Sequence, residues 1–275
     1  MAIITISRGA FSKGKEVAEK VANILGYRCV SREILLEASE HFNIPEIKLE
    51  RALHDVPSIL QKFFTYGKER YLAYISAALL EQVHQDNVVY HGLAGQFLVA
   101  GVSHVLKVRI LADMKDRVSL EMKRESLSSE EALARIRQDD EERRKWSLHL
   151  FGVDTTCPNL YDMVLHVHKL TADEVATMIS TAARLKSFQA TPQSQQALDD
   201  LLLAAQVRAE LVPVYPGVRT HASSGVVTVD AQFNVTKEPW LIDTIRQTAE
   251  RVPGVKAVEM HALPVQPYVA DHFED

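Results

Sequence analysis

The sequence is short of features that define whole classes of protein. It holds two cysteines in 275 residues, Cys29 and Cys157, too few and too far apart for a disulfide framework or a four-cysteine zinc site. No apolar run approaches the ~18 residues that a membrane-spanning helix needs. The first residues lack the basic lead and long apolar stretch of a secretory signal. We therefore expect a cytoplasmic protein in reducing surroundings.

Basic residues are in a minority, with 31 Lys and Arg against 36 Asp and Glu. The excess of acid lies in residues 191–275, which carry 6 basic and 11 acidic side chains, whereas residues 1–190 carry 25 of each. Because the chain has no basic stripe, no nucleic acid is expected as a partner. The acidic C-terminal part argues against contact with an anionic membrane.

Strand-like and helix-like segments alternate along the first 186 residues. The strand-like runs are 3–7, 27–30, 88–91, 105–111 and 163–167. The helix-like segments are 15–25, 31–40, 46–54, 66–85, 113–124, 129–149 and 171–186. Strands separated by helices predict an α/β fold, in which helices cover both faces of a parallel sheet.

A second, smaller domain is expected after residue 197. Residues 187–197 are polar and almost uncharged, a composition that predicts a linker. The segments beyond it predict a helix, two strands, a helix and a last strand, at 198–211, 218–221, 226–231, 238–252 and 255–261. This order is typical of a small α+β domain over residues 198–263, and residues 264–275 form a tail.

The segment between the first strand and the first helix carries the strongest chemical signal. It reads Gly9-Ala10-Phe11-Ser12-Lys13-Gly14-Lys15-Glu16 and fits the pattern G-x-x-x-x-G-K. In such a loop, backbone amides and a helix N-terminus surround a phosphate, and the lysine adds positive charge. The alternative for the whole loop is an ordinary strand-to-helix connection.

Glu16 stands where this pattern normally has a Ser or Thr whose hydroxyl holds Mg²⁺. Its carboxylate would either bind Mg²⁺ itself, repel phosphate, or only stabilise the first helical turn, and we favour the last.

The loop and several further motifs together resemble the cytidylate kinase-like family over about residues 1–185. The other matching segments are Ile4-Thr5-Ile6-Ser7-Arg8, Leu25-Gly26-Tyr27, Ser31-Arg32-Glu33-Ile34-Leu35, Asp116-Arg117-Val118, Asp140-Glu141-Glu142-Arg143 with Trp146, Gly152-Val153-Asp154 and Tyr161-Asp162-Met163-Val164-Leu165. The resemblance implies a P-loop kinase fold of the nucleoside monophosphate kinase type over residues 1–186. It also implies ATP, Mg²⁺, small-molecule nucleotides as partners, and an arginine-rich lid.

The resemblance implies roles for single residues as well. Within the loop that begins at Gly9, Ser12, Lys13, Gly14 and Lys15 would cradle the ATP phosphates. Arg32 would sit at the mouth of the acceptor pocket, and Arg117 and Arg124 would lie near the nucleotide base or phosphates.

The lid implied by the resemblance contains Arg137, Asp140 and Arg143. Phosphoryl transfer depends on positioning and on cationic stabilisation of the transferred group, and a closed lid strengthens those contacts by excluding water. The alternative for Arg137, Arg143 and Arg144 is a solvated helix face paired with neighbouring acids.

Two departures from the family pattern bear on activity. Phe11 and Lys13 stand where relatives have glycines, and the segment from Tyr90 to Gln96 lacks the Arg with which cytidylate kinases grip the acceptor. His91 and Gln96 would hydrogen-bond a different acceptor, or they are a core histidine and a surface amide. Three hypotheses stay open: an ATP-dependent phosphotransferase with an acceptor other than CMP, a nucleotide sensor that has lost transfer, and a scaffold.

The C-terminal segments Gly225-Val226-Val227-Thr228-Val229 and Pro253-Gly254-Val255-Lys256-Ala257-Val258 resemble a BON domain, although Ala231 replaces a usual Gly. Such domains are associated with phospholipid or small-ligand binding. Since this one is acidic, we expect it to regulate the first domain or to make a homo-oligomer.

His166 and His168 are two residues apart on an expected strand, so their rings point to one face. They could begin a metal site, but the sequence places no third ligand near them. We therefore interpret them as a hydrogen-bonded or exposed pair and predict no metal ligands.

Overall fold

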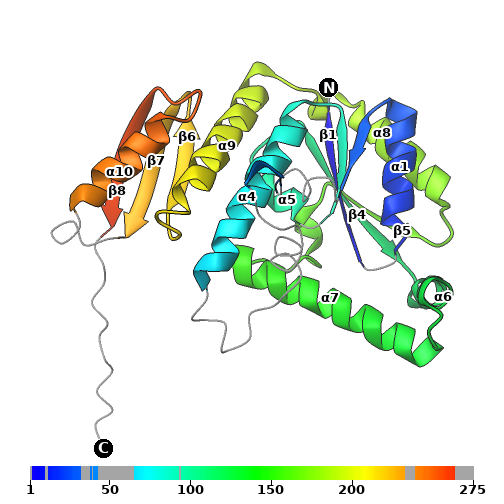
Figure 1. Ribbon diagram of the computed structural model, residues 1–275. Coiled ribbons are helices and arrows are strands. Elements are labelled where there is room, and N and C mark those ends of the chain that lie inside the picture. The colour runs from blue at the N-terminus through cyan, green and yellow to red at the C-terminus, as the bar shows by residue number, and fades with distance from the viewer. Residues whose placement is uncertain are drawn as a thin grey trace, which may run out of the picture.

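The computed structural model describes residues 2–9, 12–31, 38, 40–42, 65–92, 94–232 and 239–263. Within these ranges the chain forms a five-stranded sheet and a three-stranded sheet, joined by a long helix (Figure 1). Arg32, most of the helix expected at 31–40, the helix expected at 46–54 and the tail lie outside the described residues.

The larger sheet has the order β2-β3-β1-β4-β5, and all its neighbouring strands are parallel. Its strands are β1 (Ile3–Arg8), β2 (Arg28–Val30), β3 (Val88–His91), β4 (Val105–Ala112) and β5 (Met163–Val167). The central strand β1 is buried on both faces, as expected of a strand with helices above and below it. The predicted parallel sheet is confirmed.

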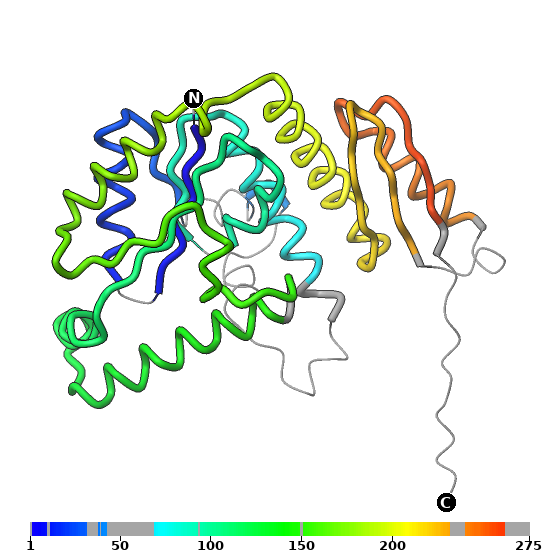
Figure 2. The backbone as a smooth tube through the Cα atoms, turned by 180° about the vertical axis from the view of Figure 1, so that it is seen from behind, coloured from blue at the N-terminus to red at the C-terminus, as the bar shows by residue number. Residues whose placement is uncertain are grey.

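Helices α1 (Gly14–Leu25) and α8 (Ala172–Ala183) cover one face of this sheet and pack against each other. Helix α4 (Thr65–His84) covers the other face. Among the described residues, this part also contains helices α5 (Gly95–Leu98), α6 (Met114–Glu125) and α7 (Ser129–Phe151). Figures 1 and 2 show α7 running across the edge of the sheet at which the strands end.

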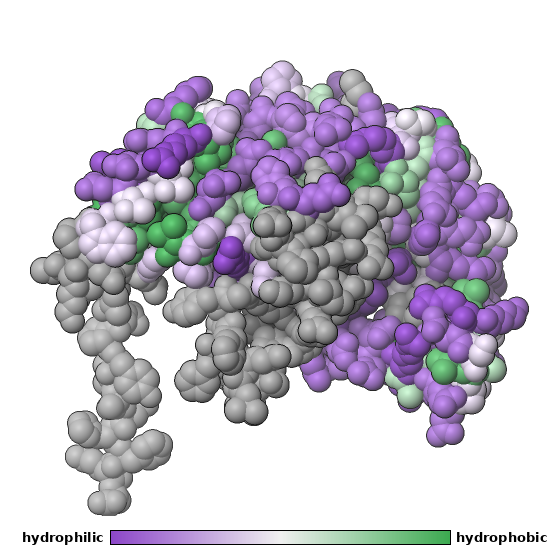
Figure 3. All heavy atoms as spheres, viewed as in Figure 1, coloured by the Kyte–Doolittle hydropathy of each residue, from purple (hydrophilic) through white to green (hydrophobic). Residues whose placement is uncertain are grey.

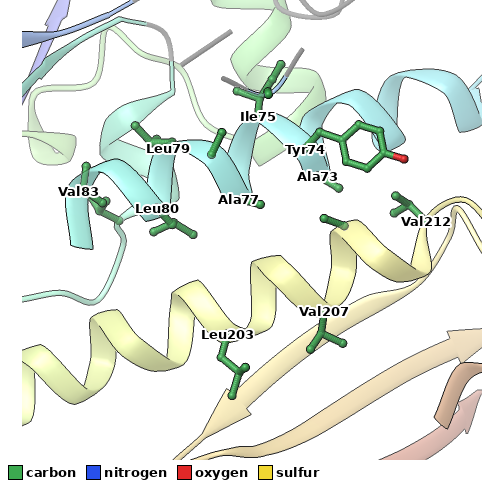
Figure 4. Close-up of a cluster of buried hydrophobic side chains, with 14 of the residues drawn as sticks. Ala73, Tyr74, Ile75, Ala77, Leu79, Leu80, Val83, Leu203, Val207 and Val212 are labelled. Carbon is green, nitrogen blue, oxygen red and sulfur yellow. The ribbon is translucent and has the colours of Figure 1, made fainter. Parts of the chain in front are cut away.

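Helix α4 is buried more completely than its sequence pattern indicates. The residues expected inward, Ile75, Ala78, Leu79 and Val83, are buried. Another four, Ala73, Tyr74, Ala77 and Leu80, are also buried because α9 (Pro192–Leu211) packs along this helix. Figure 4 shows the two helices side by side, with Leu203 and Val207 pointing from α9 toward the C-terminal strands. One hydrophobic core therefore runs from the large sheet through α4 and α9 into the small domain.

Helix α9 begins earlier than the sequence predicts. Residues 192–197, expected in the linker, form its first turns, after a short 3-10 turn (Lys186–Phe188). The Thr191 side chain accepts a hydrogen bond from the Ser194 amide, and Pro192 suits the first helical position because it needs no amide partner. The uncharged glutamine-rich segment is thus the start of a capped helix.

The C-terminal elements follow the predicted order. They are α9, β6 (Arg219–Ser223), β7 (Val226–Gln232), α10 (Pro239–Glu250) and β8 (Ala257–Leu263). β7 pairs with β6 antiparallel and with β8 parallel. The predicted inward side chains of β7, Val227, Val229 and Ala231, are buried.

The surface seen in Figure 3 is predominantly hydrophilic. Among the described helices, none combines the length and the apolar character that crossing a bilayer would require.

Candidate functional site

A cavity of about 260 Å³ opens at the carboxyl edge of the five-stranded sheet. The end of β1, the end of β4 and the middle of α7 form its walls. From β1 the chain continues to strands on one side and later returns to β4 on the other, so the strand order reverses at β1. Ligands of open α/β sheets bind outside the carboxyl ends of the strands at such a point.

After the loop that follows β1, the first backbone amides of α1 have no backbone acceptor among the described residues. Lys13 is the N-cap of α1, has a left-handed backbone with φ 61°, and makes no side-chain cap. No carbonyl of the described residues accepts a hydrogen bond from the amides of residues 14–16. The buried Ser12 hydroxyl donates to the Gly9 carbonyl at 3.0 Å. Open amides at a helix N-terminus are donors for an anion.

Lys15 does not line the cavity. Its ammonium lies 3.7 Å from Glu19 Oε1, and the side chain is 68% exposed. Lys13 and Glu16 are exposed as well. Gly14 is buried under Arg8, whose Cδ would lie 2.5 Å from a Cβ at this position. Among the described residues of the loop, Gly9 and Ser12 therefore line the cavity, while its two lysines and Glu16 face solvent.

Positive charge reaches the cavity from arginines instead. Six of them line it together with only two carboxylates, Asp140 and Glu141; the arginines are Arg8, Arg109, Arg117, Arg137, Arg143 and Arg144. Burial, with the charges of Arg143 and Arg124 nearby, lowers the pKa of Arg8, and burial lowers the pKa of Arg143. Both guanidinium groups nevertheless stay protonated at neutral pH. Arg8 Nε is buried without an acceptor among the described residues, which suits an anionic ligand.

Helix α7 lies directly against the loop. Arg117 of α6 donates to Asp140 of α7 at 2.6 Å, and a Cβ at Gly9 would come within 3.3 Å of Arg117 Nη2 and 3.4 Å of Asp140 Oδ1. Arg143 Nη1 lies 3.5 Å from the Arg8 carbonyl oxygen. A larger residue at position 9 would push this ion pair back by a few tenths of an ångström.

Seven of the predicted site residues meet in the cavity: Gly9, Ser12, Gln96, Arg117, Arg137, Asp140 and Arg143. Gln96 is buried, so its interpretation as a surface amide is wrong. His91 is buried in β3 and does not line the cavity. Arg124 is half-exposed and pairs with Glu125 at 2.8 Å, outside the cavity lining. Arg32 lies outside the described residues.

Arg144 matches in part the alternative to a lid role, in which the arginines of this helix face solvent and pair with neighbouring acids. It donates two hydrogen bonds of 2.9 Å to Glu141, which raises the pKa of Arg144 and lowers that of Glu141. The same side chain lines the cavity.

The sequence did not predict a hydrogen-bonded network around Arg109 and Tyr161, next to the cavity. Arg109 of β4 donates to the Thr155 carbonyl and, at 3.2 Å, to the Tyr161 hydroxyl. The Tyr161 oxygen also lies 3.2 Å from Ser7 Oγ and 3.5 Å from Gln96 Nε2. The available signal was the pair of basic residues, Lys107 and Arg109, in a strand that is otherwise apolar, since a charge there needs partners. Arg109 thus adds a guanidinium from the β4 side, although the segment after β3 has none.

With this geometry in view, comparison with known proteins identifies the family. Residues 3–169 match the model of the Cytidylate kinase-like family. This chain belongs to the cytidylate kinase-like family. The cytidylate kinase of Pyrococcus horikoshii is 24% identical over 183 residues, which cover 66% of this chain and 87% of the relative. That of Ignicoccus hospitalis is 26% identical over 181 residues, covering 65% and 97%.

A solved structure supports the fold of this family member. An uncharacterized protein from Eubacterium ventriosum superposes with a TM-score of 0.51 at 17% identity, covering 66% of this chain and 98% of that one. The family match ends before α9. As a member of the cytidylate kinase-like family, the chain is nucleotide kinase-like, which implies ATP and typically Mg²⁺.

The described residues fit a nucleoside triphosphate. The N-terminus of α1, the Arg8 Nε that has no acceptor among the described residues, and the surplus of arginines all suit phosphate oxygens. For Mg²⁺, which binds through one or two carboxylates together with substrate phosphates, Asp140 is a carboxylate in the cavity, and Glu16 is exposed at the usual hydroxyl position.

Proposed function

We propose that this protein is an ATP-dependent phosphotransferase that delivers a phosphoryl group to a nucleotide-like acceptor. The observation that carries the proposal is the cavity that six arginines and two carboxylates line together with Gly9 and Ser12 of the loop before α1. Such a surplus of cationic donors suits two phosphate-bearing molecules better than one neutral metabolite.

The donor phosphates would bind at the start of α1. The amides of residues 14–16 would donate to their oxygens, and Ser12 would hold the loop through its bond to Gly9. Lys15 would turn from Glu19 to the phosphates, at small cost because an exposed ion pair contributes little. When bound, ATP supplies the phosphoryl group, and Mg²⁺ neutralises charge on its phosphates.

The transferred group would lie between the loop and α7. Arg137 and Arg143 would stabilise its equatorial oxygens, since transfer depends chiefly on positioning and on such positive charge. Asp140 would orient Arg117 through their 2.6 Å bond. Helix α7 would keep water from the reacting atoms.

Arg109 is the residue that we propose for gripping the acceptor phosphate. Its guanidinium is held by the Thr155 carbonyl and Tyr161, and it lines the cavity. It would replace the arginine that cytidylate kinases carry after the third strand. Because the guanidinium would come from β4 and not from the segment after β3, we favour an acceptor other than CMP.

We propose that the C-terminal domain is BON-like and regulates this site or makes a homo-oligomer. Its connection to the kinase-like part supports the first role, because α9 packs on α4 and Gln206 donates to Glu81 at 2.9 Å. We also propose a cytoplasmic location, in line with a chain that has two cysteines far apart in sequence.

A nucleotide sensor without transfer is the second candidate. The exposed positions of Lys15 and Glu16 favour it, since neither side chain is poised toward the cavity. ATP would then bind without turnover.

ADP release, measured with each nucleoside monophosphate as acceptor, separates these candidates. We expect turnover that falls about 10²-fold in Lys15→Ala, the scale of losing one placed charge donor. Lys20→Ala is the matched control, because Lys20 lies on the same helix and pairs with Asp173 away from the cavity. Calorimetric ATP binding without turnover would establish the sensor, and absence of both would refute the two candidates together.

A further inference from the structure

Two histidines and two aspartates gather where β4 and β5 end, apart from the cavity lining. His166 lies on β5 and His168 follows one residue after the strand ends; their rings stack with centroids 6.0 Å apart. Asp113 is the N-cap of α6, and Asp116 lies in the first turn of that helix. The four side chains are about half exposed, so solvent ions reach them.

Asp113 lies between the two imidazoles. His166 Nε2 is 3.0 Å from Asp113 Oδ1, and His168 Nδ1 is 2.8 Å from Asp113 Oδ2. His168 Nδ1 is also 3.7 Å from Asp116 Oδ2. Ligand atoms of Asp113, Asp116 and His168 all lie within 4.8 Å of one another. The third ligand that the sequence did not place near the histidines is therefore present, on α6.

These separations match the ligand shell of a small divalent ion. Zinc binds nitrogen and oxygen ligands at about 2.0–2.1 Å, so two ligands of a tetrahedral ion stand about 3.3 Å apart. The separations from His168 to Asp113 and to Asp116 fall on either side of that value. Imidazole and carboxylate together suit zinc and its neighbours in the first transition row better than Mg²⁺ or Ca²⁺, which prefer oxygen alone.

We propose that His168, Asp113 and Asp116 bind a divalent transition-metal ion of the zinc type. His166 orients Asp113 through the carboxylate oxygen that faces away from His168, as hydrogen-bonded partners of metal ligands commonly do. Three protein ligands leave a fourth position for water or for a ligand.

The ion would fix the start of α6 to the end of β5. Arg117, the residue after Asp116, reaches Asp140 and Gly9 in the cavity. A metal at this place would thus hold in position the helix that carries Arg117, independently of whether the cavity catalyses transfer.

Titration of the full chain with Zn²⁺ and Co²⁺ tests the proposal without reference to turnover. We expect one equivalent of Co²⁺ to give the intense visible absorption of a tetrahedral site, and Zn²⁺ to displace it. His168→Ala and Asp113→Asn abolish this absorption, and His166→Ala weakens Zn²⁺ binding about 10- to 100-fold. Asp113→Asn keeps the size of the side chain, so it separates lost binding from lost folding.

His221→Ala is the matched control. His221 and His261 approach one carboxylate, Asp230, at 3.9 and 3.3 Å on the C-terminal sheet, and no further ligand joins them among the described residues. This variant should bind Zn²⁺ as the parent does, and Zn²⁺ should raise the unfolding temperature of both but not of His168→Ala. Equal binding by His168→Ala, or only the pale spectrum of hydrated Co²⁺, would overturn the proposal.

Discussion

The first turns of α1 and α7 differ in how their backbone amides are satisfied. At α7, the Ser128 side chain accepts from the Glu131 amide, and the Glu131 carboxylate accepts in return from the Ser128 amide. At α1, Lys13 provides no side-chain cap, and the amides of residues 14–16 meet no carbonyl of the described chain. A helix end without its own cap is satisfied by water or by a ligand. We therefore propose that a phosphate binds at the start of α1, whereas α7 lines the cavity with its side chains.

The largest expected effect concerns the side chains of α7. Arg143→Ala should lower the rate of ADP release about 10³-fold, because its partly buried guanidinium beside the loop would stabilise the transferred group. Lys145→Ala, on the same helix but exposed and paired with Glu141, should change the rate by less than about twofold. Equal rates in the two variants would assign catalysis to the loop alone.

Close contact between the loop and α7 predicts a cost in stability. Gly9→Ala brings a methyl group within 3.3 Å of Arg117 Nη2, so we expect the free energy of unfolding to fall by about 1–2 kcal/mol. Gly217→Ala is the control, since its new methyl group would have its nearest neighbour at 4.0 Å. Urea unfolding measures both, and a Gly9→Ala protein as stable as the control would mean that α7 readily moves off the loop.

A smaller effect is expected at the open end of α1. Glu16→Thr removes a negative charge from the first turn and supplies the hydroxyl that usually holds Mg²⁺. We expect ATP to bind about fivefold more tightly in the presence of Mg²⁺, by calorimetry, on the scale of one screened charge. Glu16→Gln, which removes the charge without supplying a hydroxyl, should give only part of this gain. If all three proteins bound ATP with the same affinity, Glu16 would only stabilise the helix.

The smallest expected effect is a pH-dependent change in stability at the capped N-terminus of α7. Hydrogen bonds from the Ser128 side chain and amide lower the pKa of Glu131. A carboxyl with a lowered folded-state pKa stabilises the fold above its unfolded pKa of 4.5, and this contribution is lost as the pH falls below that value. Glu131→Gln should therefore lower the unfolding temperature at pH 7 but not at pH 3. Glu130→Gln should have the unfolding temperature of the parent at both pH values. If Glu131→Gln lowered the unfolding temperature equally at pH 3 and pH 7, the capping role would be refuted.

Much of the fold could be predicted because its signals are local. The apolar runs located every strand of the large sheet, and the G-x-x-x-x-G-K pattern located the loop. The start of α9 could not be placed, because the capping by Thr191 and Ser194 was hidden in a segment whose composition is typical of a linker. The second buried side of α4 depends on α9, which lies more than 100 residues away in sequence.

The candidate site was less accessible to prediction. The family resemblance implied that Arg117, Asp140 and Arg143 belong to the site, and all three line the cavity. It could not show that Lys15 turns to Glu19, since the rotamer of an exposed lysine is set by its neighbours in space. Arg109 and the ligands around His168 depend on which strands become neighbours, which periodicity does not reveal.

Helix α9 packs against both α4 and the C-terminal strands, so it limits where the chain can be truncated. The Pyrococcus horikoshii and Ignicoccus hospitalis enzymes are matched over about two thirds of this chain. A fragment of similar extent, cut near residue 186, would leave Ala77 and Leu80 of α4 facing water. Such a truncated protein would be prone to aggregate, and its loss of activity would say nothing about regulation.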